Sequence, residues 1–385
     1  MSLLPYAHLA ARTLKSNFTR LDFPYKLTYA TTYWCNYRCQ TCNIWKMKPK
    51  DEMKLEEIRT FFKKAQHFLW VDLTGGEVSI RKDFVDICEA VVAGCPNLLL
   101  LHFPTNGYLT EQTVENVREI SKIKAEKLII TVSMDGDEVT NDRIRGVDGG
   151  WQRQMETFRQ LRDIPGVQVV LGMTLSQSNV NHFPVAFQAV KNEFPALTYN
   201  DYHVNIIHES EHFFGNAEEG LRKSVGKDDL SDAVEHYGKL RGLPKSPVSI
   251  LERAYLKRVR NYLDTGKTPI RCQALSASCF VDPWGNVFPC TIYNKQIGSL
   301  RDSEYDLTWI WNSPEAEALQ KEIWEYQCPQ CWTPCEAYQS ILGSMFRKDA
   351  PTGKKPSASG ENCRSTDRLF NVEQSGIGTE SEKQA

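Results

Sequence analysis

The sequence predicts an α/β protein, with an open barrel of six strand–helix units followed by a small cysteine-rich domain. Over the first 210 residues, strand-like apolar runs alternate with amphipathic helical runs. Strand starts recur about every 30 to 40 residues, which is the length of a βα unit. Ten of the 12 cysteines fall between 35 and 42 or between 272 and 363. This pattern predicts a metal-binding domain after the barrel.

The predicted strands are rich in Val, Ile, Leu, Tyr and Thr, and most lack strict polar–apolar alternation. That pattern is typical of strands buried on both faces of a parallel sheet. We expect these strands at 26–34, 69–74, 97–103, 127–134, 168–175 and 198–207.

The predicted helices place apolar residues on one stripe, as amphipathic helices covering a sheet do. They lie at 55–68, 83–93, 111–123, 151–161 and 183–194. Six βα units in series predict a partial (β/α)6 TIM-like barrel. In such barrels the chemistry takes place at the C-terminal ends of the strands.

Five segments are expected along the chain. They are an N-terminal amphipathic segment (1–25), the partial barrel (26–210), a helical bridge (211–268), the cysteine-rich domain (269–340) and a polar, disordered tail (341–385). The first segment carries Arg12, Lys15 and Arg20 between leucines. We expect it to pack on the protein's own surface, with peripheral membrane contact as the alternative.

Composition narrows the range of functions. The formal net charge of −2 gives no electrostatic reason to expect a nucleic acid partner. The chain begins without a secretory signal, so we expect a cytoplasmic protein. Clustered cysteines in a large intracellular chain favour metal binding over disulfides. Cys88 and Cys95, outside the clusters, are expected to be core thiols.

The first cysteine cluster directly follows the first strand. Cys35, Cys39 and Cys42 have the spacing C-x3-C-x2-C. Three thiolates on one tight loop can hold three corners of a 4Fe-4S cube and leave the fourth iron open for chemistry. A zinc site would require a fourth ligand, and none lies nearby in the sequence.

Polar turns follow the next three predicted strands. Gly75, Gly76 and Glu77 follow the second strand, Asn106 ends the third, and Ser133 and Asp135 end the fourth, with Arg143 and Arg145 shortly after. Together with the cysteine loop, these turns resemble the radical S-adenosylmethionine (radical SAM) superfamily. The resemblance implies that these residues bind S-adenosylmethionine. For each arginine, a surface ion pair is the alternative.

The second cysteine region combines a hairpin with a knuckle. Cys272, Gly285 and Cys290 form C-x12-G-x4-C, and Cys328 and Cys331 form C-x2-C. The stretch resembles the SPASM and twitch domains of radical SAM enzymes, which carry auxiliary 4Fe-4S clusters. The resemblance implies at least one auxiliary cluster on Cys272, Cys290, Cys328 and Cys331. Cys279, Cys335 and Cys363 are further candidates for a second cluster, and a zinc ribbon is the alternative.

The resemblance implies an enzyme that cleaves S-adenosylmethionine reductively to a 5′-deoxyadenosyl radical and abstracts hydrogen from a peptide, small-molecule or lipid substrate. A reductase or a protein of the flavodoxin or ferredoxin type would supply the electron. The alternatives are a non-catalytic iron–sulfur electron carrier or scaffold, and a zinc-dependent binding module. No catalytic residue is predicted. The histidine-bearing run at 202–212 is expected to be a solvated polar loop, and the alternative is that its histidines and carboxylates contact substrate or move a proton.

Overall fold

The centre of the molecule is a nine-stranded sheet with the order β6-β5-β4-β3-β2-β1-β7-β8-β9. The structure is a computed structural model and describes residues 4–123, 125–244 and 246–346. The first six strands run parallel, each paired with its neighbour in sequence, so the predicted partial barrel is confirmed. These strands are β1 (Lys26–Thr32), β2 (Trp70–Gly75), β3 (Leu100–Thr105), β4 (Lys127–Ser133), β5 (Val167–Leu175) and β6 (Tyr202–Ile206).

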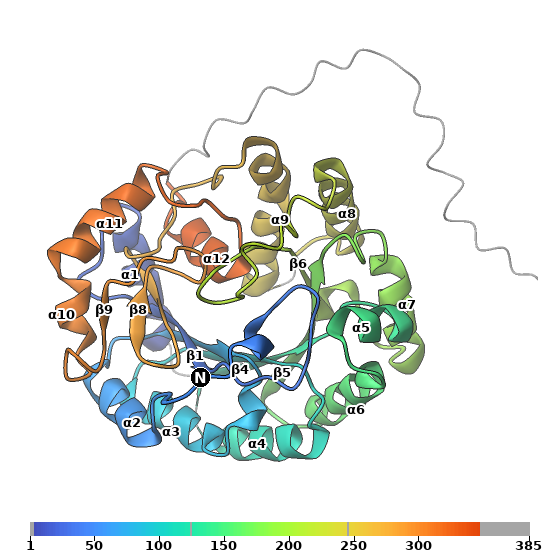
Figure 1. The fold of residues 1–385 in the computed structure, drawn as a ribbon, viewed down its shortest axis with the longest axis horizontal. Coiled ribbons are helices and arrows are strands. Elements are labelled where there is room, and N and C mark those ends of the chain that lie inside the picture. The colour runs from blue at the N-terminus through green and yellow to red at the C-terminus, as the bar shows by residue number, and fades with distance from the viewer. Residues whose placement is uncertain (1–3, 124, 245, 347–385) are drawn as a thin grey trace, which may run out of the picture. The chain divides into compact units, whose positions relative to one another are not determined.

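Helices cover the outer face of this curved sheet (Figure 1). Each buries an apolar stripe. Helix α2, for example, buries Ile58, Phe61 and Phe62, and five residues separate its end from the start of β2. The covering helices are α2 (Leu55–Lys64), α3 (Phe84–Gly94), α4 (Thr110–Lys122), α6 (Gly150–Arg162) and α7 (Phe183–Glu193). Short 3₁₀ helices occur as η1 (Ile44–Lys46), η2 (Val78–Ile80) and η3 (Tyr199–Asp201).

Helix α5 (Glu138–Arg145) was not predicted from the sequence. It follows β4 directly, where we expected only a turn. The Asp137 side chain caps its first turn by accepting from the Thr140 amide, and Gly146 ends it in the left-handed conformation. This short helix matters because it brings Arg145 back over the strand ends.

The predicted C-terminal hairpin is present, but it joins the barrel sheet instead of standing apart from it. Strand β7 (Ser278–Val281) pairs in parallel with β1, and β8 (Asn286–Phe288) and β9 (Gly298–Ser299) follow antiparallel. Gly285 makes the turn with φ of +86°, a conformation that favours glycine. The barrel and the cysteine-rich region therefore share one sheet.

The predicted bridge is helical only in its second part. Residues 211–226 form turns, and the helices are α8 (Lys227–Leu240) and α9 (Pro247–Thr265). The C-terminal region adds α10 (Leu307–Trp311), α11 (Pro314–Trp324) and α12 (Pro334–Leu342). Helix α12 crosses the predicted boundary at residue 341, because Gln339 and Ser340 are buried. Residues 347–385 of the predicted tail lie outside the described residues.

The N-terminal helix α1 (Leu4–Ser16) packs against C-terminal elements, as the sequence predicts. The Asn17 side chain donates to the Leu342 carbonyl at 3.0 Å, and the Arg20 guanidinium lies 4.6 Å from the Trp311 ring centre. In the described part of the chain, no helix combines the length and apolar character needed to cross a membrane.

Candidate functional site

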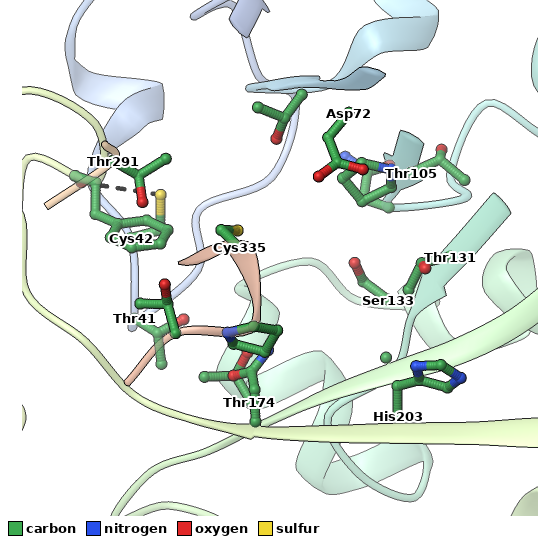
Figure 2. Close-up of a pocket in the computed structure, with 18 of the residues that line it drawn as sticks. Thr41, Cys42, Asp72, Thr105, Thr131, Ser133, Thr174, His203, Thr291 and Cys335 are labelled. Carbon is green, nitrogen blue, oxygen red and sulfur yellow. Dashed lines mark hydrogen bonds between the residues drawn. The ribbon is translucent and has the colours of Figure 1, made fainter. Parts of the chain in front are cut away.

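A cavity of about 430 Å³ occupies the barrel interior and the C-terminal ends of its strands. The cysteine loop after β1, residues from β2 to β6 and the turns at 207–214 contribute to its wall. Helix α12 contributes Cys335 and Tyr338. Figure 2 shows Cys42 on one side of this space, Asp72, Thr131 and His203 on the other, and Cys335 between them.

The cysteine loop is held in place from two sides. Arg38 and Gln40 donate backbone hydrogen bonds to the carbonyls of Arg145 and Ile144, and Asn43 donates to the Phe214 carbonyl. Cys35, Cys39 and Cys42 all line the cavity. Burial raises the pKa of Cys35 and of Cys42 to about 12, so without a positive partner these thiols stay neutral.

Most of the predicted ligand thiols accept a hydrogen bond from the backbone amide of the residue two positions after the cysteine. These hydrogen bonds lower the pKa and partly oppose the effect of burial. The donor is the amide of Tyr37 for Cys35, Ile44 for Cys42, Ala274 for Cys272, Gln330 for Cys328 and Thr333 for Cys331, while Cys290 accepts from the amides of Ile292 and, at 3.3 Å, Tyr293. Amide donors favour thiolates and stabilise the sulfurs of iron–sulfur sites, so these loops fit a cluster.

Four C-terminal cysteines lie within electrostatic reach of one another. Burial is the main cause of the raised pKa of Cys272, followed by the Glu336 carboxylate and then by Cys331 and Cys328. The pKa of Cys290 is raised by burial, then by Glu336, and then by Cys331 and Cys272. None of the four lines the barrel cavity. They form a second thiol group, separate from the one that lines the barrel cavity.

The remaining candidate ligands differ from this group. Cys279 is a fully buried residue of β7, and Cys335 faces the barrel cavity. The pKa of Cys279 and that of Cys335 are shifted neither by another cysteine nor by the backbone amide two positions after the cysteine. Cys88 and Cys95 are core thiols, as predicted. Cys363 lies outside the described residues.

In the part of the chain that the structure describes, no three His, Cys, Asp or Glu side chains meet at the spacing of ligands to a single metal ion. A 4Fe-4S cube instead takes one thiolate at each corner.

The Gly75-Gly76-Glu77 turn is locked to the cysteine loop. Gly76 donates to the Thr32 carbonyl at 2.7 Å and Glu77 to the Trp34 carbonyl at 2.9 Å. A Cβ atom on Gly76 would lie 2.1 Å from the Trp34 carbonyl oxygen, so only glycine allows this approach. The cluster loop and the Glu77 carboxylate are therefore positioned as one unit.

Glu77 is buried and heavily hydrogen-bonded. Its Oε1 accepts from the Ser79 amide, the Ser79 hydroxyl and the Thr105 hydroxyl, and its Oε2 accepts from the Asn106 amide at 2.6 Å. One acceptor position on Oε2 remains for a ligand. The Asn106 side chain donates to Asn36 on the cysteine loop, which connects the third strand to the same site.

The two predicted arginines have different environments. Arg145 is buried and lines the cavity with Ser133 and Asp135, and it pairs with Asp135 at 2.8 Å. Burial alone would lower its pKa, but Asp135 and the neighbouring Cys39 raise it, so Arg145 stays charged. Its Nε has no hydrogen-bond partner. Arg143 instead donates to the Ser178 carbonyl at the surface and does not line the cavity.

The interpretation of 202–212 as a solvated loop is wrong for two histidines. His203 lies on β6 and His208 just after it, and both line the cavity. Burial lowers the pKa of His203 to about 3 and that of His208 to about 4, so both rings are neutral. His208 accepts from the Trp332 amide at 3.1 Å, which links the barrel to the segment after Cys331.

Sequence reasoning also missed three polar residues inside the barrel. Asp72, His102 and Thr131 line the cavity from β2, β3 and β4. They lie within strands rather than at strand ends. Their only sequence signal is a polar residue inside an otherwise buried strand.

Two family models match the chain. The radical SAM superfamily model matches residues 29–205, and SPASM, described as an iron–sulfur cluster-binding domain, matches residues 272–332. Together they cover the predicted barrel and the predicted cysteine-rich domain.

Among proteins similar in sequence, the antilisterial bacteriocin subtilosin biosynthesis protein AlbA of Bacillus subtilis is 23% identical over 83% of this chain and 66% of its own length. The sporulation killing factor maturation protein SkfB of the same species is 28% identical over 41% of this chain and 37% of its own. The chain thus spans less than two thirds of these relatives.

Among solved structures, Streptococcus suis SuiB bound to its precursor peptide SuiA superposes with a TM-score of 0.56 at 16% identity, over 82% of this chain and 70% of SuiB. The structure of anSMEcpe with bound AdoMet gives a TM-score of 0.53 at 14% identity, over 83% of this chain and 96% of that one. At these identities the likeness shows a shared fold.

Proposed function

Because the chain belongs to the radical SAM superfamily and carries a C-terminal SPASM iron–sulfur domain, we propose that it cleaves S-adenosylmethionine reductively to a 5′-deoxyadenosyl radical, which abstracts hydrogen from a peptide. Superfamily members are enzymes, and both domains imply 4Fe-4S clusters. The observation that carries the proposal is that Cys35, Cys39 and Cys42 share one cavity with Glu77 and Arg145.

Cys35, Cys39 and Cys42 would hold the first cluster. Bound there, the cluster supplies the electron for the cleavage and an iron that no protein thiolate occupies. The residues of this chain would bind and orient S-adenosylmethionine. The free acceptor position of Glu77 suits the ammonium group of S-adenosylmethionine, and the unpaired Nε of Arg145 suits its carboxylate.

Cys272, Cys290, Cys328 and Cys331 would hold one auxiliary cluster. Their mutual electrostatic effects and the amide donors two residues ahead support this set. Cys279 and Cys335 share neither feature, so we leave them outside it.

A peptide substrate is supported by the relatives. AlbA is named for bacteriocin biosynthesis, SkfB for maturation of a killing factor, and SuiB was solved with a precursor peptide. The cavity of about 430 Å³ has the cysteine loop and the turns at 207–214 in its wall, which provides space for part of a peptide beside the proposed cluster. The mixed apolar and polar wall is typical of a pocket that positions a ligand through a few polar groups.

The test is S-adenosylmethionine cleavage by protein purified and reconstituted without oxygen. With a chemical or flavodoxin-type reductant, we expect about eight irons per chain, as two clusters require, and formation of 5′-deoxyadenosine. Cys39→Ala should lose about four irons and the 5′-deoxyadenosine. Cys88→Ala, at a core thiol, is the matched control and should keep both. Wild-type protein with full iron and no 5′-deoxyadenosine would support the electron-carrier alternative.

A further inference from the structure

Three adjacent barrel strands carry a hydrogen-bonded chain of carboxylate, imidazole and hydroxyl. Nδ1 of His102 lies 3.1 Å from Oδ1 of Asp72, and its Nε2 lies 2.9 Å from Oγ1 of Thr131. The residues stand on β2, β3 and β4 with their side chains in the barrel interior. This is the arrangement in which a carboxylate orients an imidazole that exchanges protons with a hydroxyl.

The carboxylate end is fixed and charged. Asp72 accepts from Trp70 Nε1 at 2.7 Å and pairs at 3.1 Å with Lys26, which is fully buried. Burial would raise the pKa of Asp72, but Lys26 and His102 hold it well below its usual range. An ionised Asp72 accepts from Nδ1–H of His102, and this assignment of the ring hydrogen leaves the lone pair of Nε2 directed at Thr131.

The hydroxyl end is fixed by a glycine on the next strand. A Cβ atom on Gly172 would lie 2.6 Å from the methyl carbon of Thr131, so Gly172 provides the space that this methyl group fills. With the methyl group over β5, the hydroxyl faces His102. Packing against Gly172 therefore fixes the rotamer of Thr131.

The Asp72, His102 and Thr131 side chains can be reached from the barrel cavity, where the substrate would bind. The side chains of His102 and Asp72 are 26% and 12% exposed, and both line the cavity with the cysteine loop. Thr131 lies two residues before Ser133, about 7 Å deeper along the strand than the proposed S-adenosylmethionine site. Figure 2 shows Ser133 and Thr131 side by side, with His203 on the same side of the cavity.

The titratable groups that β6 and α12 contribute to this space are neutral, whereas the charged Glu77, Asp135 and Arg145 line the same cavity at the strand ends. Burial, then Arg241 and His102, lower the pKa of His203, and burial raises the pKa of Cys335 to about 11. Burial likewise keeps the phenol of Tyr338, from α12, protonated by raising its pKa. Asp72 and Lys26 are thus the charged groups next to His102, while Arg241 and Glu252 lie behind His203.

We propose that His102 is the base that receives a proton from the substrate, with Asp72 as its positioning residue and Thr131 as the hydroxyl that relays the proton. The proposal rests on the proposed function, since a substrate must enter this cavity. An X–H bond of the substrate, X being sulfur, oxygen or nitrogen, breaks and leaves its electron pair on X. The proton passes to the Thr131 oxygen as the Thr131 proton passes to Nε2, and Asp72 stabilises the imidazolium.

The test measures how fast His102 is acylated at one fixed, mildly alkaline pH. Diethyl pyrocarbonate reacts with neutral imidazole nitrogens, and mass spectrometry of peptides from the anaerobic holoenzyme reports each histidine separately. Asp72→Asn should slow the acylation of His102 by about two- to tenfold, because the ring loses the carboxylate that accepts from Nδ1–H and directs the Nε2 lone pair outwards. The surface histidines His67 and His182 are internal controls, and their acylation rates should not change.

Thr131→Val provides a second variant that keeps shape and charge. It removes the hydrogen bond to Nε2, so acylation of His102 at the same pH should become about two- to tenfold faster. An unchanged rate in Asp72→Asn, or an unchanged rate in Thr131→Val, would overturn the relay. Wild-type 5′-deoxyadenosine formation is measured separately, so a failed relay is distinguished from a failed proposed function.

Discussion

The two cysteine regions differ in what surrounds their thiols. Cys35, Cys39 and Cys42 line an open cavity beside Glu77 and Arg145, whereas Cys272, Cys290, Cys328 and Cys331 lie outside that cavity. Both regions use backbone amides as donors to the thiols. The loop chemistry is therefore shared, and the difference lies in the number of thiols and in the cavity. Three thiols beside a cavity suit reaction at an open iron, while four thiols outside that cavity suit a cluster with a thiolate at every corner.

The largest expected effect separates the two regions directly. Cys39→Ala should reduce 5′-deoxyadenosine formation below detection, because the cavity cluster loses a corner. Cys290→Ala should lose about four irons yet still form measurable 5′-deoxyadenosine. Iron analysis and chromatography of the reaction check both variants. Equal loss of 5′-deoxyadenosine in the two, with folding intact by circular dichroism, would contradict the division of roles.

The next effect concerns the interior of the cavity. In the presence of a peptide that the wild type modifies, His102→Gln should lower product formation by about 10²- to 10⁴-fold, the usual contribution of general base catalysis. Gln keeps a polar side chain of similar size but cannot accept and release a proton. His182→Gln, at an exposed surface position, is the control. Product formation near the wild-type level in His102→Gln would contradict a role as the base.

Glycines in the two regions should respond differently to a methyl group. At Gly76 the added carbon meets the Trp34 carbonyl at 2.1 Å, whereas at Gly285 it meets the flexible Met53 side chain at 2.8 Å. Gly76→Ala should cost about 1–3 kcal/mol and release iron from the cavity site, because the backbone must move. Gly285→Ala carries mainly the cost of its positive φ, about 1 kcal/mol. Unfolding free energies and iron content test the order.

The sequence predicted the barrel and both cysteine groups because their signals are local. Buried parallel strands, amphipathic helices and cysteine spacings can each be recognised within a few residues of chain. The pairing of β7 with β1 was missed, because it joins residues about 250 positions apart in sequence and depends on the strand register.

The interior relay was missed for the same reason. Asp72, His102 and Thr131 become neighbours only when β2, β3 and β4 align. Nothing in the sequence favoured Arg143 or Arg145 as the cofactor-binding residue. The two residues lie on different faces of helix α5, so Arg145 reaches the cavity and Arg143 reaches the surface.

The smallest effect tests how the two regions are joined. Arg301, after the hairpin, donates to Glu57 on α2 at 2.8 Å, and Tyr305 donates to the same carboxylate. The hydrogen bond from Arg301 holds the pKa of Glu57 at about 2, below its unfolded value of about 4.3. This contribution, on the order of 1 kcal/mol, is present above pH 4.3 and is lost as the pH falls towards 2.

Thermal unfolding of wild type and Glu57→Gln measures that contribution. The two midpoints should differ at pH 7 and converge as the pH is lowered. A constant difference across this range would show that the stabilisation does not depend on the charge of Glu57. Glu56→Gln, at the neighbouring exposed position, is the control and should change the midpoint little at any pH.

The most direct test of the central claim is Mössbauer spectroscopy of ⁵⁷Fe-reconstituted protein with and without S-adenosylmethionine. We predict that about one iron in eight changes its signal when S-adenosylmethionine is added, since the cavity cluster alone has an iron without a thiolate. The variant with Cys35, Cys39 and Cys42 all changed to Ala should lose this response and keep about four irons. If no iron responds in the wild type, or if the response survives in that variant, the account of the cavity as the site of S-adenosylmethionine cleavage is contradicted.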